Sequence, residues 1–367
     1  MLYQAEPLPE LFGWTLATRA PGSSRSSQAI LNISEKGLRS WWSPALSCSR
    51  RALDMTPAAH LDVSSIHVLD GGMATELEWR GCNIYGPLWS AQVLDTSPST
   101  IQQVHLDYLR AGAECISTVS YQVSGMGYAE LGRPREDAAR ALRQSIEIAE
   151  AAGEQYARES DRVVVIAASL GPYGAALHNG AEFHGRYDIS SDALVAFHAE
   201  RLAVVAETNA ELVALETVPS YEEARAILAA LAHIPALRAW LSFTCRDGAH
   251  VAHGELLAEC AALADESNQI VAVGINCTHP RFIAELIGHA RAATGKPIFV
   301  YPNSGETWDA SARRWRGTSD VAEYAAMAVK WFEAGAQAVG GCCRTTPTHI
   351  RAVREAWEAF DDAPMRQ

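Results

Sequence analysis

The sequence predicts an α/β protein, a single (β/α)8 TIM barrel in which parallel strands alternate with helices. From residue 66 onward, short apolar runs rich in β-branched residues alternate with longer amphipathic runs. Strands that are apolar throughout are typical of a parallel sheet covered by helices on its faces. Eight such strand–helix units within about 300 residues match a (β/α)8 barrel. An open doubly wound sheet is the alternative, although no Gly-x-Gly-x-x-Gly turn follows the first predicted strand.

The predicted strands are the apolar runs 66–70, 114–119, 163–170, 212–216, 238–244, 270–276, 297–302 and 336–340. The predicted helices, which have the 3.6-residue period of an amphipathic helix, are 99–111, 135–153, 192–209, 221–232, 254–265, 281–293, 319–334 and 348–360. Residues that favour a helix N-terminus support two of these boundaries, because Ser220 precedes the fourth helix and Ser319 begins the seventh.

The first 60 residues differ from the rest of the chain. They show no sustained period of 2 or 3.6 residues, and serine, proline and arginine are scattered through them. We expect residues 1–60 to be a disordered extension, or to precede a true start near Met55, and residues 61–367 to form the barrel. A targeting peptide is the alternative, because arginines outnumber nearby acidic residues. However, acidic residues are present and no long apolar segment follows a basic start.

Composition and charge narrow the functional class. The chain has 367 residues and a formal net charge of -13, which argues against nucleic acid or an anionic membrane as the main partner. No apolar run reaches the roughly 18 residues of a membrane span. Eight cysteines are too few for a disulfide scaffold, and Cys115, Cys245 and Cys260 lie in apolar runs, where we expect small buried hydrophobes. The pattern favours a reducing compartment, the cytoplasm. The oligomeric state stays open.

The pair Cys342-Cys343, preceded by two glycines, predicts a metal site. Neighbouring side chains of a strand point to opposite faces, so both sulfurs can meet only where the backbone leaves strand geometry, and glycines supply that freedom. Gathered thiolates are typical ligands of a soft divalent metal such as zinc. Cys277, at the end of another predicted strand, is the third candidate ligand. Three sulfurs leave one coordination position open, as in a catalytic zinc site.

Polar residues gather at the carboxyl ends of the predicted strands, where barrel enzymes carry their sites. Asp70 and Glu216 end the first and fourth strands, and Tyr121 follows the second. Each has an alternative interpretation: Asp70 as a turn cap, Glu216 as part of a salt bridge, and Tyr121 as ordinary packing. We interpret His279, beside Cys277, as a turn residue rather than a ligand.

These motifs resemble the homocysteine S-methyltransferase family. The matching segments are LDGGMATEL at 69–77, TVSYQ at 118–122, ETVP at 216–219, GINC at 274–277, YPNSG at 301–305 and GGCCRTTP at 340–347. They stand in the family's order and span nearly all of the chain after residue 65. The last segment is highly specific, whereas the Asp-Gly-Gly and Glu-Thr segments are weak alone.

The resemblance implies a zinc-dependent barrel enzyme that methylates the thiol of homocysteine to give methionine. By the same resemblance the zinc ligands and catalytic residues are Cys277, Cys342 and Cys343. Asp70 and Glu216 bind the substrate ammonium, and backbone N–H groups near Gly71 and Thr118 bind its carboxylate. Further candidate site residues are Asn276, Tyr121 and Asn303, and Tyr121 or water is the candidate for the fourth ligand of the metal.

The expected methyl donor is a small sulfonium compound, S-methylmethionine first and S-adenosylmethionine second. Folate-dependent members of the family carry further large modules, and betaine-dependent members carry a long C-terminal arm, whereas only residues 361–367 follow the last predicted helix. An acidic, aromatic site would attract a sulfonium, and Trp89, Tyr301 and Trp308 are candidates for cation–π contact.

Other functions stay open at this stage. Within the family, the alternatives are a betaine-type enzyme and one that accepts selenohomocysteine or selenocysteine. A barrel hydrolase, in which zinc activates water, is disfavoured because three thiolates make a poor Lewis acid. A non-catalytic zinc- or redox-sensing protein would use Cys342 and Cys343 as a thiol switch, and it requires reversible oxidation of that pair.

Deletion of residues 1–55 is expected to leave solubility and methyl transfer unchanged, because the family motifs all lie beyond residue 65. Specific activity and soluble yield of the shortened and full-length proteins provide the measurement. Loss of either one in the shortened protein would assign a role to the extension.

Overall fold

The computed structural model describes residues 63–84, 86, 88–210, 212–309, 314–316 and 319–362, and for 307–309 and 314–316 only the backbone. The predicted N-terminal extension, residues 1–60, lies outside the described residues, so its disorder, start site and targeting role stay predictions. Within the described part, no helix has the length and apolar character needed to cross a bilayer.

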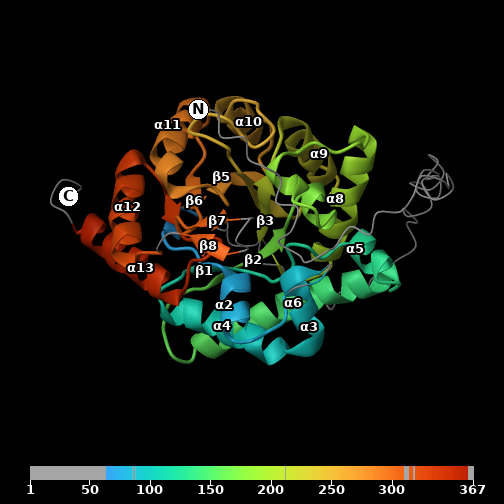
Figure 1. The fold of residues 1–367 in the computed structure, drawn as a ribbon, viewed down its shortest axis with the longest axis horizontal. Coiled ribbons are helices and arrows are strands. Elements are labelled where there is room, and N and C mark those ends of the chain that lie inside the picture. Colours follow the sequence, from blue (N-terminus) through green and yellow to red (C-terminus); the bar gives the residue numbers. More distant parts are fainter. Residues whose placement is uncertain are drawn as a thin grey trace. The chain divides into compact units, whose positions relative to one another are not determined.

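The central element is a seven-stranded parallel sheet in the order β1-β2-β3-β4-β5-β6-β9 (Figure 1). Its strands are β1 (Cys115–Ser117), β2 (Val165–Leu170), β3 (Leu212–Val218), β4 (Arg238–Phe243), β5 (Ile270–Asn276), β6 (Ile298–Tyr301) and β9 (Ala338–Val339). All neighbouring strands pair in parallel. The prediction of an α/β fold with a parallel sheet is therefore confirmed, and each strand overlaps a predicted run.

The first predicted strand, 66–70, is the exception, because the structure contains only isolated bridges there. Val68 pairs with Val339 of β9, and Leu69 pairs with Cys115 of β1, both in parallel. Two backbone hydrogen bonds of 3.0 Å, from Leu69 N to Val339 O and from Asp70 N to Cys115 O, accompany them. The segment is too short to form a ladder with either strand. It nevertheless lies between the first and last strands of the sheet, which curls so that both edges reach it.

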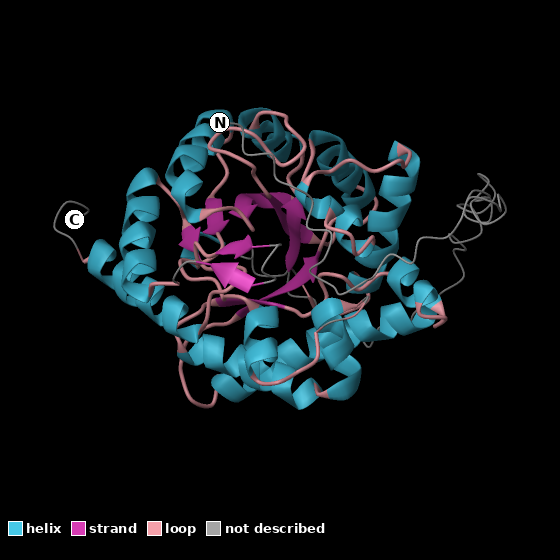
Figure 2. Cartoon of the chain, in the orientation of Figure 1, coloured by secondary structure: helices cyan, strands magenta, loops and turns pink. Residues whose placement is uncertain are grey.

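Helices surround the sheet, as Figure 2 shows with the strands at the centre. The eight that follow predicted runs are α4 (Pro98–Arg110), α6 (Arg135–Tyr156), α8 (Ser191–Val205), α9 (Tyr221–Leu231), α10 (Leu257–Ala262), α11 (Ile283–Ala293), α12 (Val321–Ala334) and α13 (Pro347–Asp361). Ser220 caps α9, as predicted, by accepting a hydrogen bond from Glu223 N at 3.2 Å. The predicted cap at Ser319 is wrong. Asp320 caps α12 instead, and the Ser319 hydroxyl bonds His349 Nε2 at 2.7 Å.

One predicted helix begins too early. The prediction placed its start at Gly254, but α10 begins at Leu257. The preceding residues form two antiparallel bridges, Cys245 with Val251 and His250 with Leu256. Gly254 has φ +134°, a conformation that interrupts helical periodicity and suits glycine.

Short elements that the prediction omitted lie in the connections between the strands and main helices. They are η1 (Val63–Ser65), α2 (Met73–Trp79), η2 (Trp89–Gln92), α3 (Val93–Thr96), α5 (Gly125–Glu130), α7 (Tyr173–Ala176), η3 (Ala181–Phe183), η4 (Leu263–Glu266), η5 (Pro280–Phe282) and the hairpin β7 (Thr307–Asp309)–β8 (Arg314–Arg316). They are too short to show a clear apolar period. Several, including α2, α5, α7, η3 and the hairpin, follow the carboxyl ends of strands, the end at which a barrel sheet carries its site.

The core lies between the sheet and the helices, and it includes the cysteines predicted to be structural. Cys115, Cys245 and Cys260 are 1%, 7% and 0% exposed, which confirms that interpretation. Trp240 of β4 is among the largest fully buried side chains, and its Nε1–H donates to Tyr301 Oη at 2.8 Å. Tyr301, predicted as a candidate for cation–π contact, is thus buried beside the end of β6 and bonded to the core.

His105 of α4 makes the stability of this core depend on pH. Its side chain is fully buried, and neither ring nitrogen has a hydrogen-bond partner among the described residues. Burial lowers the pKa of His105 to about 3, whereas an unfolded histidine titrates near pH 6.5. Between these values the unfolded state binds a proton that the folded state does not, so the free energy of unfolding falls as the pH falls. The effect from one such group is about 1.4 kcal/mol per pH unit.

His105→Leu is therefore expected to lose less stability than the native protein between pH 7.5 and pH 5. Urea unfolding curves at both pH values measure the difference, and His233→Gln at an exposed position is the control. If the native and His105→Leu proteins lost the same free energy of unfolding between pH 7.5 and pH 5, burial would not lower the pKa of His105.

Candidate metal centre

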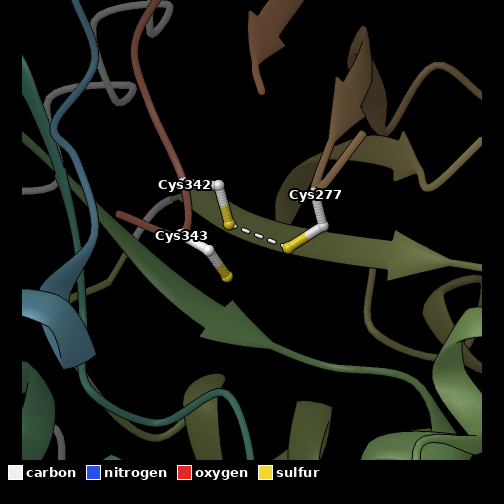
Figure 3. A group of neighbouring side chains, drawn as sticks. All are labelled: Cys277, Cys342 and Cys343. Atoms are coloured by element: carbon white, nitrogen blue, oxygen red, sulfur yellow. Dashed lines mark hydrogen bonds between the residues drawn. The ribbon is translucent and has the colours of Figure 1, made fainter. Parts of the chain in front are cut away.

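Three cysteines from two distant parts of the chain meet at one point (Figure 3). Cys277 directly follows β5, and Cys342 and Cys343 follow β9 by two glycines. The Sγ atoms of Cys277 and Cys342 are 2.8 Å apart, and all three sulfurs lie within 4.8 Å of one another. All three cysteines are free thiols. In the described part of the chain they form the one group of at least three potential metal ligands, and a soft metal such as zinc suits three sulfur ligands.

Backbone hydrogen bonds hold the Cys342-Cys343 turn against neighbouring strand ends. Gly341 N donates to Asp70 O at 2.9 Å, and Cys342 N donates to Pro302 O at 2.8 Å. Cys343 N donates to Asn303 Oδ1 at 3.2 Å. The turn is thus held by two chain segments, one at Asp70 and one at Pro302-Asn303, and the predicted site residue Asn303 is engaged in positioning Cys343.

The glycines before the pair serve a different purpose from the one predicted. Neither Gly340 nor Gly341 has a positive φ. A Cβ on Gly341 would lie 2.3 Å from Thr345 Oγ1, and one on Gly340 would lie 2.6 Å from Leu69 Cβ. The turn needs glycine because neighbouring segments approach closely. The residues with left-handed backbone are Cys277 and Arg344, at φ +49° and +66°, and such strain clusters at functional sites.

The pKa values of the clustered thiols are shifted in opposite directions. Hydrogen bonding with Cys342 raises the pKa of the Cys277 thiol well above its usual value. Hydrogen bonds from Cys277 and Cys342, with a smaller contribution from the Arg344 guanidinium, lower the pKa of Cys343 well below it. One thiolate is thereby stabilised inside the cluster, and a thiolate is the form that ligates a metal.

A bulge in β3 directs Glu216 toward the cysteines. The pairing of β3 with β4 shifts register between Leu215 and Val218, and Thr217 has φ +61°. Asn276 holds this bulge, since its Oδ1 accepts from Thr217 N at 2.9 Å and its Nδ2 donates to Thr217 Oγ1 at 2.8 Å. The predicted substrate residue Asn276 is thus engaged in fixing the strand end that carries Glu216. Bulges commonly re-aim side chains beside active sites.

Buried Asp70 and half-buried Glu216 form an acidic pair on one side of the cysteines. Glu216 accepts a hydrogen bond from Ser169 Oγ, and Asp70 accepts one from Ser117 N at 2.7 Å. Burial raises the pKa of Glu216 to about 7, and burial together with the Glu216 charge raises that of Asp70. Among the described residues neither carboxylate forms an ion pair. A cation, such as a substrate ammonium, would compensate this buried negative charge.

The predicted carboxylate-binding backbone is only partly available. Thr118 N donates to Ala167 O at 3.0 Å, so its own N–H is used within the sheet. The N–H of Gly71 has no acceptor among the described residues. A Cβ on Gly71 would lie 2.8 Å from Tyr108 Cε1, so glycine is required there for space.

Aromatic residues lie beside the cysteines as well. Tyr121 packs edge-on against Trp89, with ring centroids 6.1 Å apart. Burial raises the pKa of Tyr121, as do the charges of Glu182 and Cys277. The side chain of Trp308 lies outside the described part of the chain. His279 caps η5 by accepting from Arg281 N at 3.2 Å, consistent with its interpretation as a turn residue.

Sequence reasoning missed Ser169, Thr217 and Arg344 as members of this region. Ser169 could have been found, because a hydroxyl residue at the end of an apolar predicted strand marks a strand end facing a site. The others carry no local signal. Their positions depend on a bulge and a left-handed turn, which neighbouring segments impose.

The sequence of this chain is similar to a known protein family and to several proteins of that family. Residues 67–357 match the family model described as homocysteine S-methyltransferase. Homocysteine S-methyltransferase YbgG of Bacillus subtilis (strain 168) is 45% identical over 309 residues, 83% of this chain and 98% of the relative. Homocysteine S-methyltransferase of Escherichia coli (strain K12) is 42% identical over 81% of this chain and 96% of the relative. Selenocysteine Se-methyltransferase of Brassica oleracea var. italica is 43% identical over 78% and 88%.

Solved structures agree with the sequence relatives. The metallated form of the homocysteine methyltransferase MmuM from Escherichia coli superimposes with a TM-score of 0.71 at 41% identity, covering 79% of this chain and 96% of that one. Its oxidized form gives a TM-score of 0.72 at 40% identity, covering 79% and 95%. The resemblance inferred from the motifs is therefore confirmed.

Cys277→Ser is expected to abolish tight metal binding, because a hydroxyl is a poor ligand for a soft metal and two sulfurs would remain. Metal content after dialysis against a weak chelator, measured by mass spectrometry, is the readout, and Cys82→Ser is the matched control outside the cluster. A full metal content in Cys277→Ser would remove this residue from the ligand set.

Proposed function

This chain belongs to the homocysteine S-methyltransferase family, and we propose that it transfers a methyl group from a sulfonium donor, S-methylmethionine first, to L-homocysteine with the help of zinc. Methylation of homocysteine gives methionine, which is the activity of the family. The observation that carries the zinc and site assignments is the convergence of three thiols, within 4.8 Å of one another, beside two carboxylates whose pKa values burial raises.

Zinc fits the residues present, since three sulfur donors can hold it and leave one position for a substrate thiol. Cys277, Cys342 and Cys343 are the proposed ligands. When bound, zinc supplies positive charge that lowers the pKa of a coordinating thiol, which is otherwise mostly protonated at neutral pH.

The acidic pair is proposed to hold the amino end of homocysteine. Asp70 is buried and Glu216 half-buried, and neither carboxylate forms an ion pair among the described residues, so an ammonium between them would compensate both charges. The N–H of Gly71 is the candidate donor to the substrate carboxylate. Binding both ends of the amino acid fixes where its sulfur lies relative to the cysteines, and orientation of this kind accelerates bimolecular reactions.

The reaction is a displacement at the methyl carbon. The thiol proton of homocysteine leaves for solvent on binding, and the sulfur then attacks the donor methyl in line. A new carbon–sulfur bond forms while the bond from methyl to sulfonium breaks, and its electron pair stays on the donor sulfur. With S-methylmethionine, acceptor and donor both become methionine. Trp89 and Tyr121 are the proposed aromatic contacts of the cationic donor.

Three finer points complete the proposal. The two backbone bridges of residues 68 and 69, one to each edge of the sheet, support a (β/α)8 barrel as the architecture.

The free thiols fit a reducing compartment, and we place the enzyme in the cytoplasm. Selenocysteine is the second candidate acceptor, because the relative named selenocysteine Se-methyltransferase is 43% identical.

Methionine formation from homocysteine and S-methylmethionine, with zinc-loaded protein under reducing conditions, tests the proposal. Two methionines are expected for each methyl group transferred. If no product forms while zinc is bound, S-methylmethionine is not the donor, and S-adenosylmethionine and betaine are tested in the same assay.

Glu216→Gln is expected to raise the KM for homocysteine about 10- to 100-fold, since a charge-assisted hydrogen bond contributes about 1.5–3 kcal/mol. The zinc content should not change. Steady-state kinetics and metal analysis are the measurements, and Glu207→Gln at an exposed position is the control. An unchanged KM would mean that Glu216 serves the fold rather than the substrate.

A further inference from the structure

The hydroxyl of Thr345, two residues after the cysteine pair, joins two parts of the proposed site. The Thr345 side chain is fully buried. Its Oγ1–H donates to Cys342 O at 2.7 Å, and the same Oγ1 accepts from Gly72 N at 3.1 Å. A threonine hydroxyl has a single proton, so it serves here as donor to one segment and as acceptor from the other. One buried oxygen therefore links the turn that carries two cysteines to Gly72, the residue that precedes α2.

A second threonine holds the same turn from α2 (Met73–Trp79). Thr75 is buried in this helix, and its Oγ1 accepts from Arg344 N at 3.0 Å. Arg344 directly follows the cysteine pair and has φ +66°, a left-handed conformation that is costly for a residue other than glycine. The bond from Thr75 therefore fixes the strained residue of the turn against the helix.

Glycines on both segments leave the space that Thr345 occupies. A Cβ on Gly341 would lie 2.3 Å from Thr345 Oγ1, and one on Gly71 would lie 3.0 Å from the same atom. A Cβ on Gly72 would lie 2.6 Å from Cys342 O. Side chains at these three positions would push the segments apart. The two segments are thus fitted to each other at the Thr345 hydroxyl.

Each of the two linked segments carries groups of the proposed site. The turn carries Cys342 and Cys343, two of the proposed zinc ligands. The other segment carries the Asp70 carboxylate and the Gly71 N–H, which are proposed to hold homocysteine. Gly341 N donates to Asp70 O at 2.9 Å, so the segments are joined before the cysteine pair as well as after it. A shift of one segment against the other would change both the ligand geometry and the position of the substrate.

We propose that Thr345 is a positioning residue that holds the zinc-binding turn at a fixed distance from the homocysteine-binding segment, with Thr75 supporting the turn from α2. The inference rests on the proposed function, because it takes the cysteines as zinc ligands and residues 70–72 as the segment that binds homocysteine. Thr345 acts through Cys342 and Gly72. Hydrogen bonds that orient metal ligands typically change metal affinity about 10- to 100-fold.

Thr345→Val removes the hydroxyl and keeps the shape of the side chain. Gly72 N then lacks its acceptor, while Cys342 O keeps the bond from the backbone N of residue 345, 3.2 Å long in the native protein. The turn is loosened rather than lost. Zinc affinity, measured by competition with a chromophoric chelator, is expected to fall about 10-fold or more. The KM for homocysteine at saturating zinc is expected to rise about 3- to 10-fold. Thr345→Ser retains the hydroxyl and should restore most of both.

Thr346→Val is the matched control. Thr346 is the neighbouring buried threonine, and its Oγ1 bonds His349 Nδ1 at 3.0 Å rather than either of the two segments. Urea unfolding of the metal-free proteins measures the stability that each variant loses. Thr346→Val should lose stability while its zinc affinity and KM stay native. An equal loss of zinc affinity in Thr345→Val and Thr346→Val would mean that the Thr345 hydroxyl serves stability alone, and would overturn the proposal. Native zinc affinity and KM in Thr345→Val would overturn it too.

Thr75→Val provides a second test that does not require Thr345→Val to fold. It removes the bond to Arg344 N and leaves both bonds of the Thr345 hydroxyl. Zinc affinity is expected to fall, with a smaller rise in the KM for homocysteine than in Thr345→Val. The absorption spectrum of the cobalt-substituted protein, which depends on ligand geometry, should change in Thr75→Val and stay native in Thr346→Val. A native spectrum together with native zinc affinity in Thr75→Val would contradict the proposed support from α2.

Zinc binding and turnover together separate this inference from the proposed function. A native protein that makes methionine, with equal zinc affinity in the native and Thr345→Val proteins, contradicts the inference alone. A native protein that loses zinc affinity in Thr345→Val but makes no methionine from any donor supports the inference and contradicts the proposed function. Zinc content that does not depend on Cys277, Cys342 or Cys343 contradicts both, because the turn would then hold no metal ligand.

Discussion

The hydrogen bonds of residues 67–70 to both edges of the sheet are the constraint on which the site depends. Leu69 N donates to Val339 O, and Asp70 N donates to Cys115 O, so one short segment holds β9 beside β1. Gly341 N, in the turn that carries two of the cysteines, donates to Asp70 O at 2.9 Å. Without this segment the Cys342-Cys343 turn would lose a support, and the carboxylate of Asp70 would not lie next to the cluster.

The region around the cysteines concentrates negative charge that the protein itself does not neutralise. Asp70 and Glu216 are acids whose pKa values are raised mainly by burial. Three thiols lie beside them. A site of this kind suits positively charged ligands, and the proposed reaction has three: a metal ion, an acceptor ammonium and a donor sulfonium. Each acidic group then has a partner only in the fully loaded enzyme, so the folded protein retains an electrostatic cost that ligand binding removes.

Local backbone strain is concentrated in the same region. Among the described residues other than glycine, those with positive φ are Trp89, His178, Thr217, Cys277 and Arg344. Four of them border the cluster or its proposed ligands: Cys277 is a proposed ligand, Arg344 follows the pair, Thr217 forms the bulge and Trp89 contacts Tyr121. The strain is tolerated because tertiary hydrogen bonds compensate it, as the two bonds between Thr217 and Asn276 do for the bulge.

The sequence by itself determined the family, the parallel sheet and the three cysteines that meet. Those features are local: apolar runs form strands wherever they can be buried, and the GGCCRTTP segment is specific within eight residues. Only the tertiary structure decided that 66–70 is a bridge rather than a strand, that Asp320 rather than Ser319 caps α12, and that Asn276 and Asn303 support the site. Such positions depend on hydrogen bonds and close contacts between segments far apart in the chain, and no local pattern of residues specifies those partners.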